Sequence, residues 1–271
     1  SLERGAQPAR DVAEVLAHDH RAGPRRLEPQ HGEHRGARHR HVGPRRAVLR
    51  HPEGALEAAG CAVTLKQVTT RGDQVQDVPL SEVGDDALFT KELDRAMLRG
   101  EIDIAVHSLK DLPSRIPEGI VLAAVSERAT PFDAFVAHPT FDGALQDLPE
   151  GATLATSSLR RKAQLKAWRP DLNIVPVRGN VDSRLEKLNA SSWHGMVLAV
   201  AGLVRMELDE VIRTAFPPAI MIPAVGQGAL GVTCRTDADA ALQRLLADTI
   251  HDATTGRAAT AERGFMREIG G

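Results

Sequence analysis

The stretch LFTKELDRAMLRGEIDIAVHSLKDLP, residues 88–113, determines the fold class that the sequence predicts. Residues 88–99 are expected to form a helix. Gly100 follows as its C-terminal stop, because glycine readily adopts the left-handed conformation that ends helices. Residues 102–106 then form an apolar strand, and an alternating strand is expected earlier, at residues 62–68. The order strand, helix, strand is typical of a doubly wound α/β sheet.

The same alternation of strands and helices continues along the chain. Val181, Leu185 and Leu188 are spaced i, i+4 and i+7, so they share one buried face of a helix. The pattern therefore predicts a second α/β unit. The expected strands lie at 120–125, 133–136, 152–155, 173–177, 196–200 and 230–234, and the expected helices at 159–167, 181–188, 240–246 and 258–269.

Length and composition limit the class of protein. A chain of 271 residues is long enough for about two domains. Aromatic residues make up 3% of the chain, so its cores must be mainly aliphatic. Cys61 and Cys234 are too few for a disulfide framework, and no apolar run reaches the roughly 18 residues of a membrane span. These features predict a protein of a reducing compartment that does not cross a membrane.

Residues 1–51 differ from the rest of the chain. They hold 7 of the 11 His, 11 Arg and no Lys, and no strand or helix periodicity runs through them. This composition predicts an atypical, disordered arm. Metal binding by the His and nucleic-acid binding by the Arg are weaker alternatives, because the His spacings match no usual set of metal ligands. The expected organisation is this arm, a first domain at 52–128 with 223–248, a second domain at 129–222, and the start of a third at 249–271.

Charge is distributed unevenly along the chain. The net charge is −2, but residues 150–205 carry 9 basic and 4 acidic side chains, or +5. Residues 1–51 also carry +5, which leaves −12 for the remainder. A basic segment inside an acidic body indicates a local anionic ligand. A nucleic-acid groove would be more broadly basic and richer in aromatic residues.

Arginines follow the ends of three expected strands, which in an open α/β sheet share the edge where ligands bind. Arg160 and Arg161 follow Ser157 and Ser158, which are natural helix N-caps, with Leu159 between them. Positive charge in the first helical turn opposes the helix dipole, and a bound anion would compensate for it. The alternative is a pair of solvated arginines on a surface turn. The other arginines of this pattern are Arg178, Arg184 and Arg205.

Two further stretches place polar residues beside expected strands. In AVHSLKDLP, Lys110 and Asp111 follow a strand that Pro113 prevents from continuing. A carboxylate that faces an arginine-lined edge is suited to hold a cationic or N–H-bearing group. A salt bridge between Asp111 and one of the arginines is the alternative. In PAVGQGAL, two glycines flank Gln227, which indicates either a hinge turn or a backbone brought close to a ligand.

Six stretches, in order along residues 56–271, resemble the porphobilinogen deaminase family, also called hydroxymethylbilane synthases. They are LFTKELD, AVHSLKDLP, ATSSLRRKAQL, VRGNVDSRLEKL, VLAVAGLVRM and PAVGQGALGV. The resemblance implies two doubly wound domains similar to periplasmic binding proteins, plus a truncated α+β third domain. It also implies a transferase of tetrapyrrole and heme biosynthesis. Such an enzyme condenses four porphobilinogen molecules head to tail, with loss of ammonia, to linear hydroxymethylbilane.

The resemblance also implies roles for particular residues. Asp111 is the catalytic acid, which holds pyrrole N–H groups and stabilises the cation left when ammonia departs. The arginines bind the acetate and propionate groups of the pyrroles, including those of a dipyrromethane cofactor. The residues expected to bind substrate or cofactor are Lys91, Ser108, Lys110, Thr156, Ser157, Ser158, Arg160, Arg161, Arg178, Gly179, Asn180, Arg184, Arg205 and Gln227.

The sequence departs from the family pattern at both ends. Residues 1–51 lack the Gly-Thr-Arg-x-Ser-x-Leu-Ala motif and the strand before it, so we expect the first sheet to lack one strand. Their composition resembles a gene read out of frame, which sequencing of the gene in its other frames would test. The cysteine that carries the cofactor in the family is expected immediately after Gly271, so the chain is expected to be incomplete.

These features predict one partner, the small molecule porphobilinogen, and no metal, nucleic acid or membrane. The protein is expected to be cytoplasmic and monomeric. A non-catalytic two-domain module that binds polycarboxylates is the alternative function, because the fold alone does not imply catalysis. A binding module of this kind would not explain why Asp111 lies beside Lys110 at the end of a strand.

Overall fold

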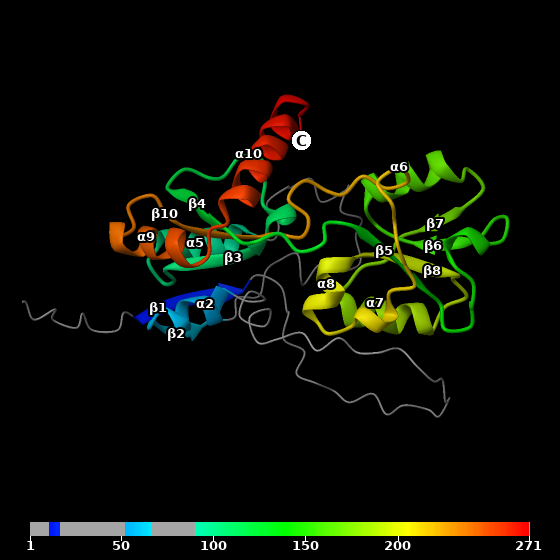
Figure 1. The fold of residues 1–271 in the computed structure, drawn as a ribbon, viewed down its shortest axis with the longest axis horizontal. Coiled ribbons are helices and arrows are strands. Elements are labelled where there is room, and N and C mark those ends of the chain that lie inside the picture. Colours follow the sequence, from blue (N-terminus) through cyan, green and yellow to red (C-terminus); the bar gives the residue numbers. More distant parts are fainter. Residues whose placement is uncertain (1–10, 17–51, 67–89, 271) are drawn as a thin grey trace, which may run out of the picture.

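The computed structural model describes residues 11–16, 52–66 and 90–270, which form two α/β domains side by side (Figure 1). Each domain is built around a five-stranded sheet. In the first domain the strand order is β2 (Ala62–Leu65), β1 (Asp11–Leu16), β3 (Ile104–Ser108), β10 (Leu230–Arg235) and β4 (Ile120–Val125). In the second domain the order is β7 (Asn173–Val175), β6 (Thr153–Ala155), β8 (Gly195–Ala199), β5 (Asp133–Ala137) and β9 (Thr214–Ala215).

Both sheets are mixed. β1 is parallel to β2 and β3, and β6 is parallel to β7 and β8. β10 runs antiparallel between β3 and β4, and β5 runs antiparallel between β8 and β9. The chain reaches β10 after it has built the second sheet, so β10 is a return strand that completes the first. This topology confirms the predicted pair of α/β domains.

β1 corrects the prediction for the N-terminal segment. Asp11–Leu16 lies between β2 and β3 and pairs in parallel with both. The first sheet therefore does not lack a strand, and disorder is the wrong prediction for this segment. β1 pairs with β2 through Asp11–Glu14 and with β3 through Glu14–Leu16, and such long-range pairing leaves little trace in local periodicity. The rest of the predicted arm, at 1–10 and 17–51, lies outside the described residues.

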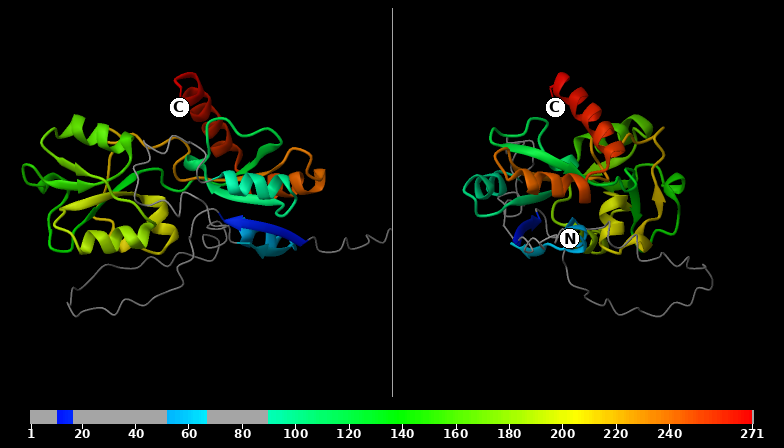
Figure 2. Two further views of the ribbon diagram at one scale, coloured as in Figure 1. Left: turned by 180° about the vertical axis from the view of Figure 1, so that it is seen from behind. Right: turned by 60° about the vertical axis from the view of Figure 1, so that its left-hand side comes forward.

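Helices cover the faces of both sheets (Figures 1 and 2). Gly60 and Gly100 follow the first two helices with positive φ angles of 85° and 72°, as expected for helix stops. In the first domain the helices are α2 (Pro52–Ala58), α5 (Lys91–Leu98), α9 (Ala240–Thr249) and α10 (Ala253–Glu268). In the second they are α6 (Leu159–Trp168), α7 (Val181–Asn189) and α8 (Val200–Arg205). Within the described ranges, every helix is too short or too polar to span a membrane.

Each sheet packs against a mainly aliphatic core, as the low aromatic content predicts. In the first domain, Leu56 of α2 and Leu246 of α9 are fully buried against the sheet. In the second domain, Leu165 of α6 packs with Phe135 of β5 and Val197 of β8. These contacts fix the positions of the strand ends, where the candidate site lies.

The chain crosses twice between the two sheets. The outgoing crossover, residues 126–132, follows β4, and the return crossover, residues 216–229, precedes β10. The two segments lie side by side, because the N–H of Ala129 donates to the carbonyl of Gly228 at 3.1 Å. The predicted boundaries between the first and second domains fall within these segments, and the division into domains stays a prediction.

α10 packs on the first domain and projects from it at its C-terminal end (Figure 1). Ala259 lies in a buried cluster with Leu109 and Val125 of the first domain. Arg263 donates from Nη2 to the carbonyl of Pro113 at 2.6 Å. The helix predicted at 258–269 is therefore the second half of a longer one, and a separate third domain stays a prediction.

Candidate functional site

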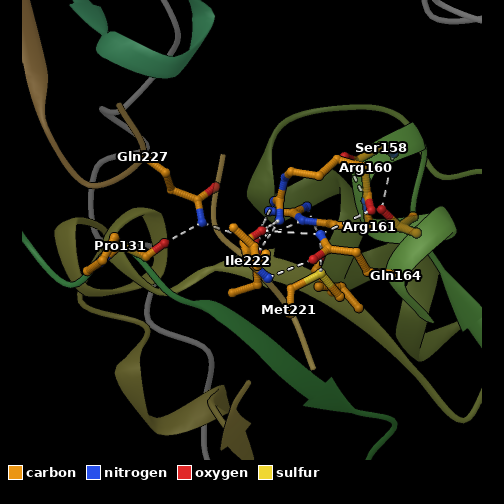
Figure 3. Close-up of polar contacts among 11 residues, drawn as sticks. Pro131, Ser158, Arg160, Arg161, Gln164, Met221, Ile222 and Gln227 are labelled. Carbon is orange, nitrogen blue, oxygen red and sulfur yellow. Dashed lines mark hydrogen bonds and ion pairs between the residues drawn. The ribbon is translucent and has the colours of Figure 1, made fainter. Parts of the chain in front are cut away.

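A buried ion-pair cluster lies at the start of β5. Asp133, the first residue of this strand, is fully buried. Arg160 Nη1 lies 2.8 Å from Asp133 Oδ2, and Arg160 Nη2 donates to Oδ1 at 3.1 Å. Arg161 reaches the same Oδ1 through Nε at 2.9 Å and Nη2 at 2.7 Å. Figure 3 shows the two arginine side chains converging on one group of polar contacts.

The arginines keep Asp133 charged in spite of its burial. Burial raises the pKa of the Asp133 carboxyl, but the charges and hydrogen bonds of Arg161 and Arg160 outweigh it and hold that pKa below its usual value. Burial also lowers the pKa of Arg161, and Asp133 opposes this shift. The sequence analysis gave Asp133 no role, because its pairing with α6 joins segments that share no local pattern.

Both arginines are also bound to the backbone. Arg161 Nη1 donates to the carbonyl of Val197 in β8 at 2.9 Å, and Arg160 Nη1 donates to the carbonyl of Ile222 at 2.6 Å. The Arg161 side chain is 8% exposed and the Arg160 side chain 25%. The alternative of solvated arginines on a surface turn is therefore wrong for Arg161, whereas Arg160 keeps part of its side chain accessible.

The second strand-end arginine lies in the first turn of α7. Gly179 has a φ of 116°, which favours glycine, and Asn180 Oδ1 caps the helix by accepting from Ser183 N at 2.9 Å. Arg184 then donates from Nε to the carbonyl of Gly179 at 2.6 Å. Burial lowers the pKa of Arg184, and the charge of Arg161 adds to this shift. Arginines of two different helices therefore face one region.

The remaining arginines lie on either side of this region. The charge of Arg178 also lowers the pKa of Arg184, so Arg178 belongs to the same electrostatic group. Arg205 of α8 instead donates from Nη2 to the carbonyl of Gly228 at 2.6 Å. This bond ties the second domain to the return crossover, a contact that the sequence analysis did not foresee.

The first domain contributes a short 3-10 turn, Leu109–Asp111, directly after β3. Leu109 is buried, and its N–H donates to the carbonyl of Ala229 at 3.0 Å. Gly226 lies so close to this turn that a Cβ there would sit 2.8 Å from Leu109 Cγ. The turn that carries Lys110 and Asp111 is therefore anchored to the return crossover.

Electrostatic interactions at this turn join the two domains. Burial lowers the pKa of Lys110. Four neighbouring charges also act on it, those of Asp111, Arg161, Asp133 and Arg184. Asp111 acts in turn on Arg161 and Arg184, whose pKa it raises against the effect of burial. Among the residues that the structure describes, no direct ion pair joins Asp111 to an arginine, so the predicted salt-bridge alternative is not observed.

Gln227 connects the return crossover to the ion-pair cluster. Its side chain is almost completely buried, and Nε2 donates to Asp133 Oδ1 at 3.1 Å and to the carbonyl of Pro131 at 2.5 Å (Figure 3). Within the described ranges, Gln227 Oε1 has no hydrogen-bond partner. A buried acceptor without a partner costs free energy, so Oε1 is a candidate acceptor for an N–H group of a ligand.

The crossovers are also bound to α10. Arg128, in the outgoing crossover, donates from Nε to the carbonyl of Gln227 at 2.9 Å and from Nη2 to Glu262 Oε2 at 3.1 Å. Glu262 also accepts from Arg128 Nη1 and, at 2.8 Å, from Gly226 N. One carboxylate of α10 therefore holds both crossovers. No local sequence pattern indicates this contact, because it joins three segments far apart in the chain.

Hydroxyl groups predicted to bind ligand also make local hydrogen bonds, and their binding roles stay predictions. Ser157 Oγ donates to the carbonyl of Val177 at 2.8 Å and accepts from Val177 N at 3.0 Å. Thr156 Oγ1 accepts from Ser158 N at 3.2 Å. These bonds hold the turns at the ends of β6 and β7 together. The predicted binding residues whose roles stay predictions include Lys91 at the start of α5 and Ser108 at the end of β3.

The donors of this site suit a ligand with several carboxylates. Guanidinium groups pair with carboxylates through two parallel hydrogen bonds. In the described part of the chain, no His, Cys, Asp or Glu residues gather as a metal site would require. Fold and site together define a two-domain α/β protein with an arginine-rich site where the domains meet.

Comparisons with known proteins identify the family. The family model described as "Porphobilinogen deaminase, dipyromethane cofactor binding domain" matches residues 47–243. A porphobilinogen deaminase from Syntrophomonas wolfei is 46% identical over 224 residues, which cover 82% of this chain and 72% of that protein. One from Roseiflexus castenholzii is 49% identical over 219 residues, which cover 80% and 71%. The chain therefore belongs to the porphobilinogen deaminase family, which confirms the resemblance seen in its motifs.

Solved structures of similar shape include transport proteins of low sequence identity. A periplasmic substrate-binding protein of an ABC transporter from Coxiella burnetii aligns with a TM-score of 0.49 at 14% identity, over 94% of this chain and 97% of that one. A nutrient-binding protein from Burkholderia cenocepacia aligns with a TM-score of 0.45 at 15% identity, over 96% of both chains.

Proposed function

We propose that the arginine-rich site binds the carboxylates of pyrroles and that Asp111 stabilises the positive charge that forms as ammonia leaves. The chain is a transferase of the porphobilinogen deaminase family, a hydroxymethylbilane synthase of tetrapyrrole biosynthesis. Its reaction joins four porphobilinogen molecules head to tail. One observation carries the assignment of the site: the return crossover holds both of its parts, because Ala229 O accepts from Leu109 N at 3.0 Å and Gln227 Nε2 donates to Asp133 Oδ1 at 3.1 Å.

The charge of the site supports anion binding. Five cationic side chains face two carboxylates, so the group carries a net charge of +3 without a ligand. Burial and neighbouring cations lower the pKa of Arg184, which means that its charged form lacks compensation. An acetate and a propionate on each pyrrole would supply that compensation through charge-assisted hydrogen bonds. The cations are Lys110, Arg160, Arg161, Arg178 and Arg184, and the carboxylates are Asp111 and Asp133.

Asp111 has the chemistry that the departure of ammonia requires. A carboxylate accepts hydrogen bonds from N–H groups and stabilises positive charge on the ring to which they belong. Its turn is anchored through Leu109, so the carboxylate needs little reorganisation as charge develops. Charge stabilisation by a preorganised group is commonly the largest single contribution to catalysis.

The same residues fit the carboxylates of the family's dipyrromethane cofactor. The guanidinium groups of Arg160 and Arg184 would hold them, and the unpaired Oε1 of Gln227 can accept a hydrogen bond from a pyrrole N–H. When bound, the cofactor supplies the chain end to which the first substrate is added. Cys61 and Cys234 pack in the core of the first domain, so neither lies at this site.

We also propose that the protein acts in the cytoplasm as a monomer, without nucleic acid. Both cysteines are free thiols, which suits a reducing compartment, and the basic side chains gather at one site rather than along a groove. Light scattering during size-exclusion chromatography would test the monomer, since a mass near twice 29.2 kDa would contradict it.

The function is tested by replacing Asp111 with Asn and measuring both porphobilinogen binding and ammonia release. Loss of the negative charge should leave the dissociation constant within about threefold but reduce ammonia release about 10²- to 10³-fold, as expected for a group that stabilises charge in the transition state. Asp147→Asn is the matched control, because Asp147 ends another 3-10 turn, Leu145–Asp147, in the second domain.

Three results would argue against the proposal. Near-normal ammonia release by Asp111→Asn would remove Asp111 from the mechanism. Binding of porphobilinogen by the unmodified chain without ammonia release would favour the non-catalytic binding module. A similar loss of activity in Asp147→Asn would show that the effect is not specific to the site.

A further inference from the structure

Asp133 leaves one edge of Arg160 accessible. Arg160 meets Asp133 end-on, with Nη1 2.8 Å from Oδ2 and Nη2 3.1 Å from Oδ1. The second N–H of Nη1 donates to the carbonyl of Ile222. Among contacts within the described residues, Arg160 Nε and the outer N–H of Nη2 have no acceptor. These two N–H groups form the side edge of the guanidinium, which can hold a carboxylate through two parallel bonds.

Arg161 is used in the opposite way. Its Nε and Nη2, which form the side edge, both contact Asp133 Oδ1, and its Nη1 donates to the carbonyl of Val197. The Arg161 side chain is 8% exposed, and its contacts are made within the protein. Asp133 therefore contacts the two neighbouring arginines differently. It occupies the side edge of Arg161, whereas it leaves the side edge of Arg160 accessible.

Asp133 itself is held firmly. Its Oδ1 accepts from Arg160 Nη2, from Arg161 Nε and, at 3.1 Å, from Gln227 Nε2 of the return crossover, and Arg161 Nη2 lies 2.7 Å from the same oxygen. The carboxylate is completely buried, so a ligand cannot displace it without opening the domain. A buried carboxylate whose Oδ1 is held by several donors is suited to fix the orientation of a neighbour, which lowers the entropy that a ligand must overcome.

We propose that Asp133 is a positioning residue that orients Arg160, so that the side edge of this guanidinium binds one carboxylate of a pyrrole unit. Gln227 fixes Asp133 from the return crossover, and Arg161 serves mainly as a counterion. This inference rests on the proposed function, because it names the residue that prepares the anion site of the same enzyme. Asp133 acts through Arg160 and does not contact the substrate.

Asparagine is the informative replacement at position 133. It keeps the size of the side chain but turns one oxygen into an N–H₂ group. That group faces donors of Arg160, so the guanidinium must rotate away. Loss of the negative charge alone would strengthen the binding of an anion. We expect the loss of orientation to outweigh the loss of charge. A rotated Arg160 loses its two directed bonds to the ligand carboxylate, whereas the charge of Asp133 does not contact the ligand.

The test is a double-mutant cycle on the affinity for porphobilinogen, measured by titration calorimetry with the full chain. Asp133→Asn should weaken binding about tenfold, which corresponds to about 1.4 kcal/mol. Arg160→Lys keeps the charge but lacks the side edge, and should weaken binding to a similar extent. Both changes remove the same interaction, the bond between the side edge of Arg160 and the ligand carboxylate. Asp133→Asn should therefore change affinity less than about twofold in the Arg160→Lys background.

A second pair of measurements separates orientation from a general loss of structure. Asp133→Glu should restore part of the affinity, because it keeps the carboxylate. Gln227→Glu should weaken binding about threefold, because it removes the Nε2 donor that fixes Asp133 but keeps an oxygen acceptor for the ligand. Asp171→Asn is the matched control, since Asp171 pairs with Arg169 on the surface of the same domain and lies outside the cluster. In steady-state kinetics the KM of Asp133→Asn should rise more than its kcat falls.

The outcomes distinguish this inference from the proposed function. If Asp133→Asn binds more tightly, or if its effect adds fully to that of Arg160→Lys, Asp133 does not position Arg160. If Asp133→Asn does not fold, an unchanged affinity of Gln227→Glu overturns the inference instead. If the unmodified chain does not bind porphobilinogen, or Arg160→Lys binds normally, the proposed function of the site fails together with the inference.

Discussion

Arg205 of α8 donates from Nη2 to the carbonyl of Gly228 at 2.6 Å, and so joins the second domain to the segment that returns to the first. Gly228 also accepts from Ala129 N, so both crossovers and one helix meet at a single peptide group. The relative position of the domains, and with it the distance from Asp111 to the arginines, depends on this junction.

Gly228→Ala should therefore disturb the site from a distance. Gly228 has a φ of 96°, and a Cβ there would lie 2.4 Å from the carbonyl oxygen of Ala129. Both strain and the backbone clash oppose the substitution, so we expect a loss of more than about 2 kcal/mol in the free energy of unfolding, measured in urea. Ammonia release should fall as well, because the crossovers must move apart.

Gly202→Ala is the matched control for this change. Gly202 lies inside α8, and no atom lies within 4 Å of the position its Cβ would take. Alanine is a better helix former than glycine, so this variant should gain about 0.5–1 kcal/mol. Equal stability of the two variants would contradict the role assigned to the junction.

The two adjacent arginines of α6 should respond differently to replacement by lysine. Arg161→Lys removes buried bonds to Asp133 and to the carbonyl of Val197, and should lower the free energy of unfolding by about 1–3 kcal/mol. Arg160→Lys should cost less stability, because its side chain is 25% exposed, but should weaken porphobilinogen binding. Parallel unfolding and calorimetric titrations check both. The reverse pattern would show that Arg161 faces the ligand.

The buried carboxyl of Asp94 in α5 should make the free energy of unfolding decrease as the pH rises. Burial raises the pKa of Asp94 to about 6, from an ordinary value of 3.8. The folded state therefore binds this proton more tightly than the unfolded state. Its contribution to stability is complete below about pH 4 and is lost as the pH rises to about 6. Asp94→Asn should remove this loss and gain about 1–3 kcal/mol at pH 7.5, but nothing at pH 4.

Urea unfolding of both forms between pH 4 and pH 8 measures this effect. Asp237→Asn serves as the control, because it makes the same change at a largely exposed aspartate beside Arg235. A constant difference between Asp94→Asn and the unmodified chain across this range would show that Asp94 has an ordinary pKa.

Much of the fold follows from local signals. Ser158 and Asn180 begin helices where N-caps are expected, and Gly100 follows α5 with positive φ. These signals act within one helical turn, so the amino-acid sequence displays them directly. The boundaries of single elements shift by a few residues: the strand predicted at 62–68 ends at Leu65, and the helix predicted from 88 begins at Lys91.

The sequence by itself determined the class of elements, the family and the basic character of the site, because capping residues, periodicity and motifs are local. The tertiary structure alone decided that β1 completes the first sheet and that Asp133 receives Arg160, Arg161 and Gln227. It also placed Lys110 and Asp111 among the charges of the other domain. These relationships join segments that are far apart in the chain. Their energy depends on burial and on distances between packed elements, and neither exists before the chain folds.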